Sequence, residues 1–343
     1  MTTIYDFHRF DAVPQQQHPL NPNWTGQANG VGTYTQAQDL SPEMKTFYDK
    51  VLIRMAGPNL VHDQFGQKRP IPGGNGKVIE FRKFSKLPKA LTPLTEGITP
   101  AGQNFGVTAL TAEIRQYGAY IAMTDMLELT AFDNTMAEIA KMLGDQAGLT
   151  SDTITRDVLV AGGNILYPGT ASSRATIAKT DVMSVKLIKK AVNKLMRQNA
   201  PKINGSYVAI IHPDTLFDLW EDPEWVDASK YAGSTQIFTG EVGKLYGVRF
   251  VISTEAKCFG TVGASSAPVY ATLVLGENAF GVTSINGGGI ETIAKQKGSG
   301  GTSDPLNQRS TMGWKMNKAV KILADEYMVR IEHSTSVAGA AAN

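Results

Sequence analysis

Apolar residues recur at helical spacing over residues 135–162. Thr135-Met-Ala-Glu138 forms a capping box, in which hydroxyl and carboxylate each accept from the other residue's backbone N–H, and Gly162-Gly163 favours a helix end. One apolar stripe, with helical spacing, connects these signals. Its members are Met136, Ile139, Ala140, Leu143, Ala147, Ile154 and Val158. The pattern predicts one of the longest helices of the chain, although Gly144 and Gly148 weaken it.

A second helical pattern runs from about Val182 to Asn199, just before Pro201. Its apolar side consists of Val185, Ile188, Val192, Leu195 and Met196. Its outer side is basic and consists of Lys186, Lys189, Lys190, Lys194 and Arg197. A basic face can touch nucleic acid, but a solvated helix face is its commoner meaning.

Runs of β-branched and aromatic residues predict two strands, Lys77–Leu87 and the longer Gly106–Met123. Residues 88–104 between them are rich in Pro, Thr and Gly, so the strands form a hairpin with an unusually long loop. A two-stranded projection is poorly stable by itself. We therefore expect the hairpin to lie on another surface, which a second subunit can supply.

The region 181–290 mixes strands and helices compactly, as a domain does. Strands are predicted at Tyr207–Ile211, Val248–Ile252 and Tyr270–Leu275, and a helix opens at His212-Pro-Asp214. The last part of the chain returns to strands, predicted at Gly313–Leu323 and Tyr327–Glu332. In the final strand Tyr327, Val329 and Ile331 alternate with Met328, Arg330 and Glu332.

The segment 14–42 is rich in Gln, Asn, Pro, Gly and Thr and almost uncharged. Such a segment cannot bury enough apolar area to fold alone. It is either a disordered tail or an arm that orders against a partner, and its aromatic residues Trp24 and Tyr34 favour the arm. A helix is predicted to start at Ser41-Pro42, with the apolar stripe Phe47, Val51 and Met55. The C-terminal SVAGAAAN is expected to fray.

The composition is typical of a globular protein and gives no support to several other classes of protein. Of the 343 residues 42% are hydrophobic and 19% charged, and the net charge is only +2, so charge does not point to nucleic acid or membrane. A single cysteine, Cys258, excludes an internal disulfide. The beginning of the chain does not read as a signal peptide, and its apolar runs fall far short of the roughly 20 residues of a spanning helix.

The sequence offers little catalytic chemistry. Gly73-Gly-Asn-Gly-Lys77 fails as a Walker loop because Ile71 and Val78 replace the required Gly and Ser or Thr. The five histidines are not spaced as helical metal ligands, so no metal or other cofactor is expected. His62-Asp63 could be an oriented base, and Cys258 reads as a packed or incidental thiol. This weakens the enzyme hypothesis without excluding a site assembled from distant residues.

An arm and a long hairpin that need neighbours, joined to compact domains, describe a shell-forming subunit. Four turn and packing motifs sharpen this picture: Ile211-His-Pro-Asp214, Asp222-Pro-Glu-Trp-Val-Asp227, Gly243-Lys-Leu-Tyr-Gly-Val-Arg249 and Asp304-Pro-Leu-Asn-Gln-Arg309. With them the chain, from about Val51 to its end, resembles the major capsid proteins of tailed phages related to the N-four-like podoviruses.

The resemblance implies the Hong Kong-type phage capsid fold, an α+β class. Its parts, transferred to this chain, are an N-terminal arm, an extended hairpin loop, a peripheral domain with a spine helix, an axial domain, and terminal strands that rejoin the peripheral domain. Their expected bounds are 1–60, 61–123, 124–180, 181–290 and 291–343.

The implied function is structural, not enzymatic. The chain is expected to form hexamers and pentamers that close into an icosahedral shell around packaged double-stranded DNA, assembled in the host bacterial cytoplasm and found in the virion. Expected partners are the chain itself, a portal, scaffolding or decoration proteins, and DNA contacted without sequence preference, but no membrane. The alternative is an encapsulin-like shell of a cellular nanocompartment.

Nine residues are expected at contacts between subunits. Hairpin charges are expected to form ion pairs across subunits, each worth roughly 0 to 1 kcal/mol when exposed, and ordinary solvation is the alternative for them. Aromatic residues complete the set. The nine are Trp24, Tyr34, Arg82, Lys83, Lys86, Lys89, Glu96, Trp225 and Tyr231.

Overall fold

The structure is a computed structural model. The residues described below all belong to one compact unit of the chain, which spans residues 38–343. The residues described are 50–52, 54–56, 60–71, 77–84, 87–94, 96–99, 102–130, 135–225, 241–283, 290–299, 304–337 and 341–343.

Four helices carry most of the helical content among these residues. They are α2 (Asp125–Thr130), α3 (Thr135–Val160), α4 (Val185–Arg197) and α5 (Pro213–Glu221). Short 3-10 turns are η2 (His62–Phe65), η3 (Arg174–Thr176), η4 (Ala264–Ser266) and η6 (Asp325–Tyr327). Helix α3 is the helix that the capping box predicted, and its 26 residues make it the longest one described.

The largest sheet has six strands in the order β5-β14-β9-β6-β8-β7. Their bounds are Ile165–Leu166, Met328–His333, Tyr270–Leu275, Tyr207–Ile211, Val248–Ile252 and Glu241–Leu245. The central strands are buried on both faces, which is why they read as continuous apolar runs. Helices α4 and α5 supply apolar side chains to the core on one face of this sheet. The other face meets the C-terminal end of α3.

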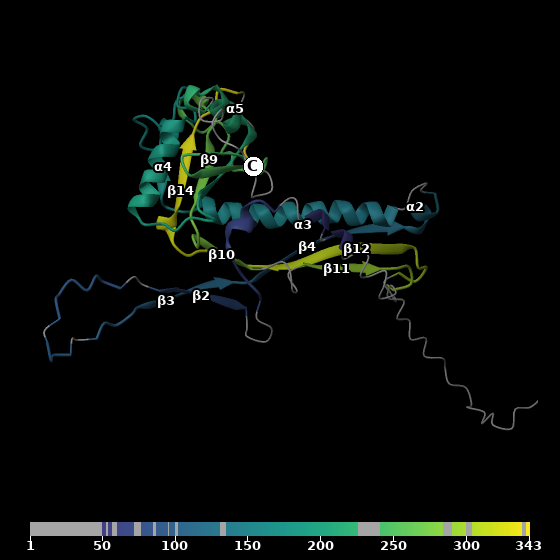
Figure 1. The fold of residues 1–343 in the computed structure, drawn as a ribbon. Helices are drawn as coiled ribbons and strands as arrows, with labels where there is room; N and C mark the ends of the chain where they lie inside the picture. Colours follow the sequence, from purple (N-terminus) through teal and green to yellow (C-terminus); the bar gives the residue numbers. More distant parts are fainter. Residues whose placement is uncertain are drawn as a thin grey trace, which may run out of the picture. The chain divides into compact units, whose positions relative to one another are not determined.

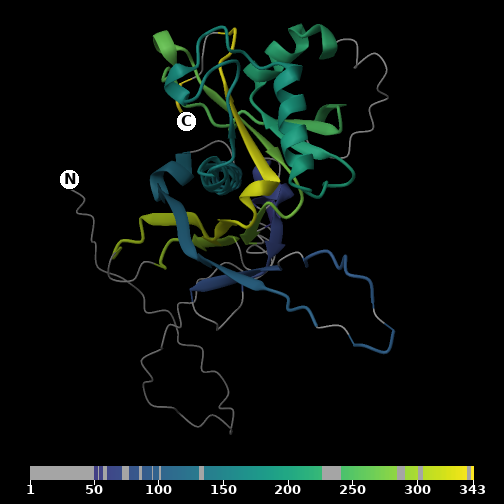
Figure 2. The same cartoon turned by 90° about the vertical axis from the view of Figure 1, so that its left-hand side faces the viewer.

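A second sheet lies against the rest of α3. It has the order β11-β12-β4, with bounds Ile290–Lys295, Arg309–Lys318 and Arg115–Thr124. Figure 2, in which α3 is seen end-on, shows this sheet along one side of the helix. Trp314 on β12 fixes the helix to the sheet, because its Nε1 donates to Gln146 Oε1 at 3.1 Å.

Two smaller sheets connect the hairpin to the body. One has the order β1-β10-β13 (Gln67–Arg69, Phe280–Thr283, Val320–Ile322), and the other pairs β2 (Val78–Phe84) with β3 (Val107–Glu113). Phe81 on β2 is fully buried against β10. A Cβ at Gly281 would lie 2.3 Å from its ring, so the glycine makes room for this anchor. Figure 1 shows the loop between β2 and β3 running out beyond the paired strands.

The predicted strand Gly106–Met123 is in fact two strands in two different sheets. β3 pairs with β2, but β4 pairs with β12 along its full length. The N–H of Ile114 donates to Lys77 O at 2.8 Å, which closes the first ladder. The chain stays extended through the junction, so hydrophobic periodicity carries no signal that the partner strand has changed.

The final strand also differs from the pattern in its sequence. β14 is buried along both faces, including its charged residues. Glu332 accepts from Arg174 Nε at 2.9 Å and from Nη2 at 2.6 Å, while Arg330 Nε lies 2.9 Å from the same carboxylate. A charge that is paired and hydrogen-bonded can be buried at tolerable cost, so alternating charges do not always mark a wet face.

Three smaller expectations are also corrected. Met196 on α4 is about half exposed, whereas Leu187 and Ala191 are buried in its place. In the first helical segment Leu52 and Ala56 are buried more deeply than Val51 and Met55 of the predicted stripe. In the tail that was expected to fray, Asn343 is held, since its side chain accepts from the backbone N–H of Cys258 at 2.9 Å.

Candidate subunit interface

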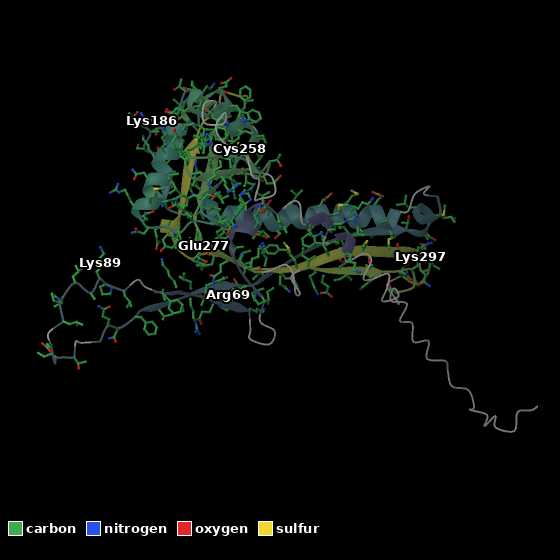
Figure 3. All side chains as sticks on the ribbon, in the orientation of Figure 1. Arg69, Lys89, Lys186, Cys258, Glu277 and Lys297 are labelled. Atoms are coloured by element: carbon green, nitrogen blue, oxygen red, sulfur yellow. The ribbon has the colours of Figure 1, made fainter. Side chains whose placement is uncertain are left out.

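The loop between β2 and β3 exposes an unusual number of large apolar side chains. Leu91 is 83% exposed and Leu94 is 78% exposed, values close to those of an unfolded chain. The other exposed apolar residues of the loop and its strand ends are Phe84, Leu87, Ile98, Phe105 and Val107. Figure 3 shows side chains standing out from the loop around Lys89. Soluble monomers rarely expose contiguous apolar surface of this kind, so the loop is a candidate contact surface.

A hollow of about 730 Å³ lies on sheet β11-β12-β4. Gly118 and Gly313 form its floor, because the side chains that would fill the centre of this sheet face are missing there. The glycines are required by the sheet itself, since a Cβ at Gly313 would lie 2.7 Å from Tyr120 Cβ and one at Gly118 would lie 2.6 Å from Trp314 O. The hollow can therefore admit bulky side chains from outside.

The rim of the hollow combines large apolar side chains, Tyr120 and Ile293, with charged groups. Tyr120 is 75% exposed there. Lys315 Nζ lies 2.9 Å from Glu291 Oε2 on the neighbouring strand, and Lys295 and Arg309 add positive charge. An apolar centre with a polar rim is the usual composition of a protein–protein contact.

Five of the nine sequence-predicted contact residues lie within the described part. Arg82 Nε is bound within its own strand, 3.0 Å from Glu80 Oε1. Lys83 Nζ lies 2.6 Å from Glu326 Oε1, so in the single chain its ion pair is internal. Lys89 and Glu96 are exposed on the loop.

The fifth residue, Trp225, is 7% exposed and packs edge-on against Phe250 in the core, with the ring centroids 4.8 Å apart. Trp24, Tyr34, Lys86 and Tyr231 lie outside the described residues. The interface role of all nine stays a prediction.

The structure adds residues that sequence reasoning missed. The apolar residues of the loop were a usable signal, because Leu91, Leu94 and Ile98 stand in a segment of Pro, Thr and Gly that cannot form a core of its own. The hollow had no such signal. Gly118 and Gly313 are nearly 200 positions apart, and only the register of β4 with β12 brings them to one face.

The histidines that sequence analysis considered have structural roles. His62 and Asp63 do not form an oriented pair, because His62 Nδ1 bonds Asp152 Oδ2 at 2.6 Å while Asp63 binds other groups. His212 accepts from the backbone N–H of Asp214 at 3.2 Å and caps α5, and burial lowers the pKa of its imidazole. Burial also lowers the pKa of His333 to about 4.

Among the described residues, no group of three or more His, Cys, Asp or Glu side chains is arranged to hold a metal ion. None of the helices in that part of the chain combines the length and the hydropathy needed to cross a membrane. The predicted packed thiol is confirmed, since Cys258 is buried.

The sequence profile of the family "Phage capsid protein" matches residues 107–331. No curated protein matches the chain.

Solved structures of phage shells share the fold. One is the capsid of Ralstonia phage GP4, with a TM-score of 0.67, 18% sequence identity, and coverage of 81% of this chain and 89% of that chain. The cyanophage Pam1 capsid follows with a TM-score of 0.61, 14% identity, and coverage of 78% and 87%. The capsid of cyanophage P-SCSP1u has a TM-score of 0.60, 15% identity, and coverage of 81% and 89%.

Proposed function

The chain belongs to the phage capsid protein family, with the Hong Kong-type phage capsid fold that its motifs suggested, and we propose how its copies join into a shell. The hairpin loop of one subunit lies in the hollow of sheet β11-β12-β4 of the next. Repetition of this contact builds hexamers and pentamers, which close into the icosahedral shell around the packaged genome.

The exposed apolar surface of the loop carries the proposal. Leaving side chains such as Leu91 and Leu94 in water is unfavourable, and burying apolar surface gains about 25 cal/mol per Å². The hollow offers a glycine floor and Tyr120 as apolar contacts. Each loop–hollow contact is small, but every subunit makes one as donor and one as acceptor, so a closed shell sums many of them.

The charged residues contribute more to the orientation of the loop in the hollow than to the affinity of the contact. The rim of the hollow carries Lys295 and Arg309 together with the acidic Asp304, and Glu96 is the acidic residue that the loop can bring to the two cations. An exposed pair of this kind is worth roughly 0 to 1 kcal/mol, but it disfavours wrong orientations of the loop. We place the basic residues Arg82, Lys86 and Lys89 beside the same contact, on the side of the acidic Asp304.

The relation of the chain to one group of tailed phages, and its partners in the virion, are also proposals. The motifs from Ile211 to Arg309 support a relation to the N-four-like podoviruses, and with it a portal protein, scaffolding or decoration proteins, and double-stranded DNA as partners. We also propose that the chain divides into five parts, which are the arm, the extended loop, the spine-helix region, the axial domain and the terminal strands. The phage capsid family match supports a viral shell over the encapsulin-like alternative.

The test is assembly of the purified chain, followed by size separation and electron microscopy of the heaviest fraction. We expect hexamers, tubes or closed shells from the parent, and their loss from Leu91→Ser/Leu94→Ser and from Tyr120→Ser. These side chains are exposed, so the unfolding midpoint of each variant stays at the parent value.

Val262→Ser is the matched control, because Val262 is an exposed apolar residue outside both surfaces and its loss leaves assembly unchanged. Normal shells from both variants would contradict the loop–hollow contact. A parent chain that stays monomeric with candidate scaffold proteins present would contradict the proposed function itself.

A further inference from the structure

Helix α3 packs against two different hydrophobic cores. Its first half contributes Ile139, Leu143 and Ala147 to a core shared with Met312, Trp314 and Met316 of β12. Its last turn contributes Leu159 and Val160 to another core, shared with strands of the six-stranded sheet. The helix therefore connects the sheet β11-β12-β4 with the six-stranded sheet (Figure 1).

A polar belt separates the two cores on the helix. Ser151, Asp152 and Thr155 have no exposed surface, and Arg156 is 2% exposed. Buried polar groups on successive helix positions are costly unless each has a partner. The partners come from three separate parts of the chain.

The first partner is the turn η2, just after the N-terminal segment. The backbone N–H of His62 donates to Asp152 Oδ1 at 2.7 Å, and His62 Nδ1 bonds Asp152 Oδ2 at 2.6 Å. Asp63 accepts from Ser151 Oγ at 3.0 Å and also from the hydroxyl of Thr155.

The second partner is the last residue of β12. Lys318 Nζ donates to the carboxylate of Asp63 and to Ser151 Oγ, the latter at 2.7 Å. The Lys318 side chain is 1% exposed, and burial lowers the pKa of its amine. Helix, turn and sheet thus meet in one buried ion pair with hydroxyl donors.

The third partner is the loop after β8, in the six-stranded sheet. Arg156 Nη1 donates to Glu255 O at 2.9 Å and lies 3.7 Å from Glu255 Oε2. The guanidinium also binds Asp157 Oδ1 at 3.0 Å, and Lys257 Nζ lies 3.6 Å from the same carboxylate oxygen. Within the seven residues 151–157, the contacts of the helix therefore pass from the sheet β11-β12-β4 to the six-stranded sheet.

We propose that residues 151–157 of α3 form a joint that fixes the angle between the two sheets, and through it the curvature of the shell. Apolar packing is non-directional, so the two cores alone would tolerate small rotations about the helix. Hydrogen bonds and ion pairs in a dry site require defined distances and angles. The belt makes one angle preferred, as buried polar groups do where they specify a single arrangement.

The consequence for assembly rests on the proposed function. A closed shell of one size requires that copies of the chain meet at reproducible angles. If the contact surfaces lie on different sides of the joint, a small change of angle within each subunit adds up around the shell. A looser joint would leave the subunit folded and able to associate, but would broaden the range of particle sizes.

The test is the double variant Asp63→Leu/Lys318→Met, which replaces the buried ion pair by apolar side chains and so keeps the fold. We expect the same helix content by circular dichroism and assembled particles of several diameters, or tubes, where the parent gives one diameter. Arg156→Met, on the other side of the joint, gives the same broadening. The readout is the diameter distribution by electron microscopy.

Lys141→Met is the matched control, because Lys141 forms an exposed ion pair with Glu138 on the same helix and lies outside the belt. It leaves the diameter distribution unchanged. Parent-like particles of one diameter from both joint variants would overturn the joint, even with the shell function intact. A parent chain that never assembles would overturn the proposed function, and the joint would then be tested in the subunit alone. There, faster hydrogen exchange of η2 and the end of β12 in the double variant is expected, and unchanged exchange would overturn it.

Discussion

Removal of one partner from the buried pair Asp63–Lys318 should destabilise the subunit far more than removal of both. In Lys318→Met, the carboxylate of Asp63 stays at 4% exposure without its cation. Breaking a buried ion pair in this way costs about 3 to 5 kcal/mol. Ser151 and Thr155 still donate to the carboxylate, so we expect the lower end of that range.

The double variant Asp63→Leu/Lys318→Met removes both charges of the ion pair together, and Asp152 keeps its hydrogen bonds to His62. Thr155 keeps an acceptor, because its hydroxyl also bonds Ser151 O at 3.3 Å within the helix. Replacement of a buried ion pair by apolar residues is often neutral or stabilising. The free energy of unfolding of the double variant is therefore expected to lie within about 1 kcal/mol of the parent value.

The assay is thermal unfolding of the isolated subunit, followed by circular dichroism. An unfolding entropy of about 2.1 cal/mol/K per residue converts a loss of 3 to 5 kcal/mol into a fall of roughly 4 to 7 °C in the midpoint. The single variant should show this fall and the double variant should recover most of it. Equal, additive losses in Lys318→Met and Asp63→Leu, with no recovery in the double, would refute the reasoning, because they would mean that the two groups do not interact.

Three further predictions concern other buried groups. The folded-state pKa of His333 is lowered to about 4, below its unfolded value near 6.5, so the stability that its neutral imidazole contributes is complete above pH 6.5 and is lost as the pH falls toward 4. In His333→Gln the unfolding midpoint should therefore fall less steeply between pH 6.5 and pH 4 than in the parent. A fall as steep as the parent's would contradict this. Gly281→Ala should destabilise by about 1 to 3 kcal/mol because its Cβ meets the ring of Phe81, and a double-mutant cycle with Phe81→Leu in urea should show coupling, whereas strict additivity would count against the contact. Cys258 should react with a thiol reagent only at the rate of unfolding, and prompt labelling of the native chain would show that it is accessible.

The sequence predicted those elements well whose partners are local or whose burial is complete. Strands Tyr207–Ile211, Val248–Ile252 and Tyr270–Leu275 have the predicted bounds, because a strand buried on both faces is a continuous apolar run between turns. The helix from Thr135 followed from its capping box, and α5 followed from His212-Pro-Asp214. In each case the signal lies within the element.

The structure differs from the sequence prediction where a partner that is distant in the sequence determines the environment of a segment. β3 and β4 read as one strand because the change from β2 to β12 leaves the chain extended. The burial of Glu332 cannot be read from the sequence, because Arg174, which pairs with it, lies 158 positions away. The hollow at Gly118 and Gly313 has the same cause, since register between distant strands is a property of the folded sheet.

The belt on α3 shows what an interrupted pattern can mean. The predicted apolar stripe runs at spacings of three and four until Ala147 and resumes only at Ile154, and Ser151 and Asp152 fall in the gap. Read alone, the gap looks like a weak helix face, and His62-Asp63 looks like a candidate base elsewhere. The structure joins the two observations, because the acidic and hydroxyl groups in the gap bind that dipeptide. A helix that passes from one core to another needs no apolar residue at the crossing. A polar residue there can bind a specific partner, and in α3 the break in the stripe coincides with the junction between the two cores.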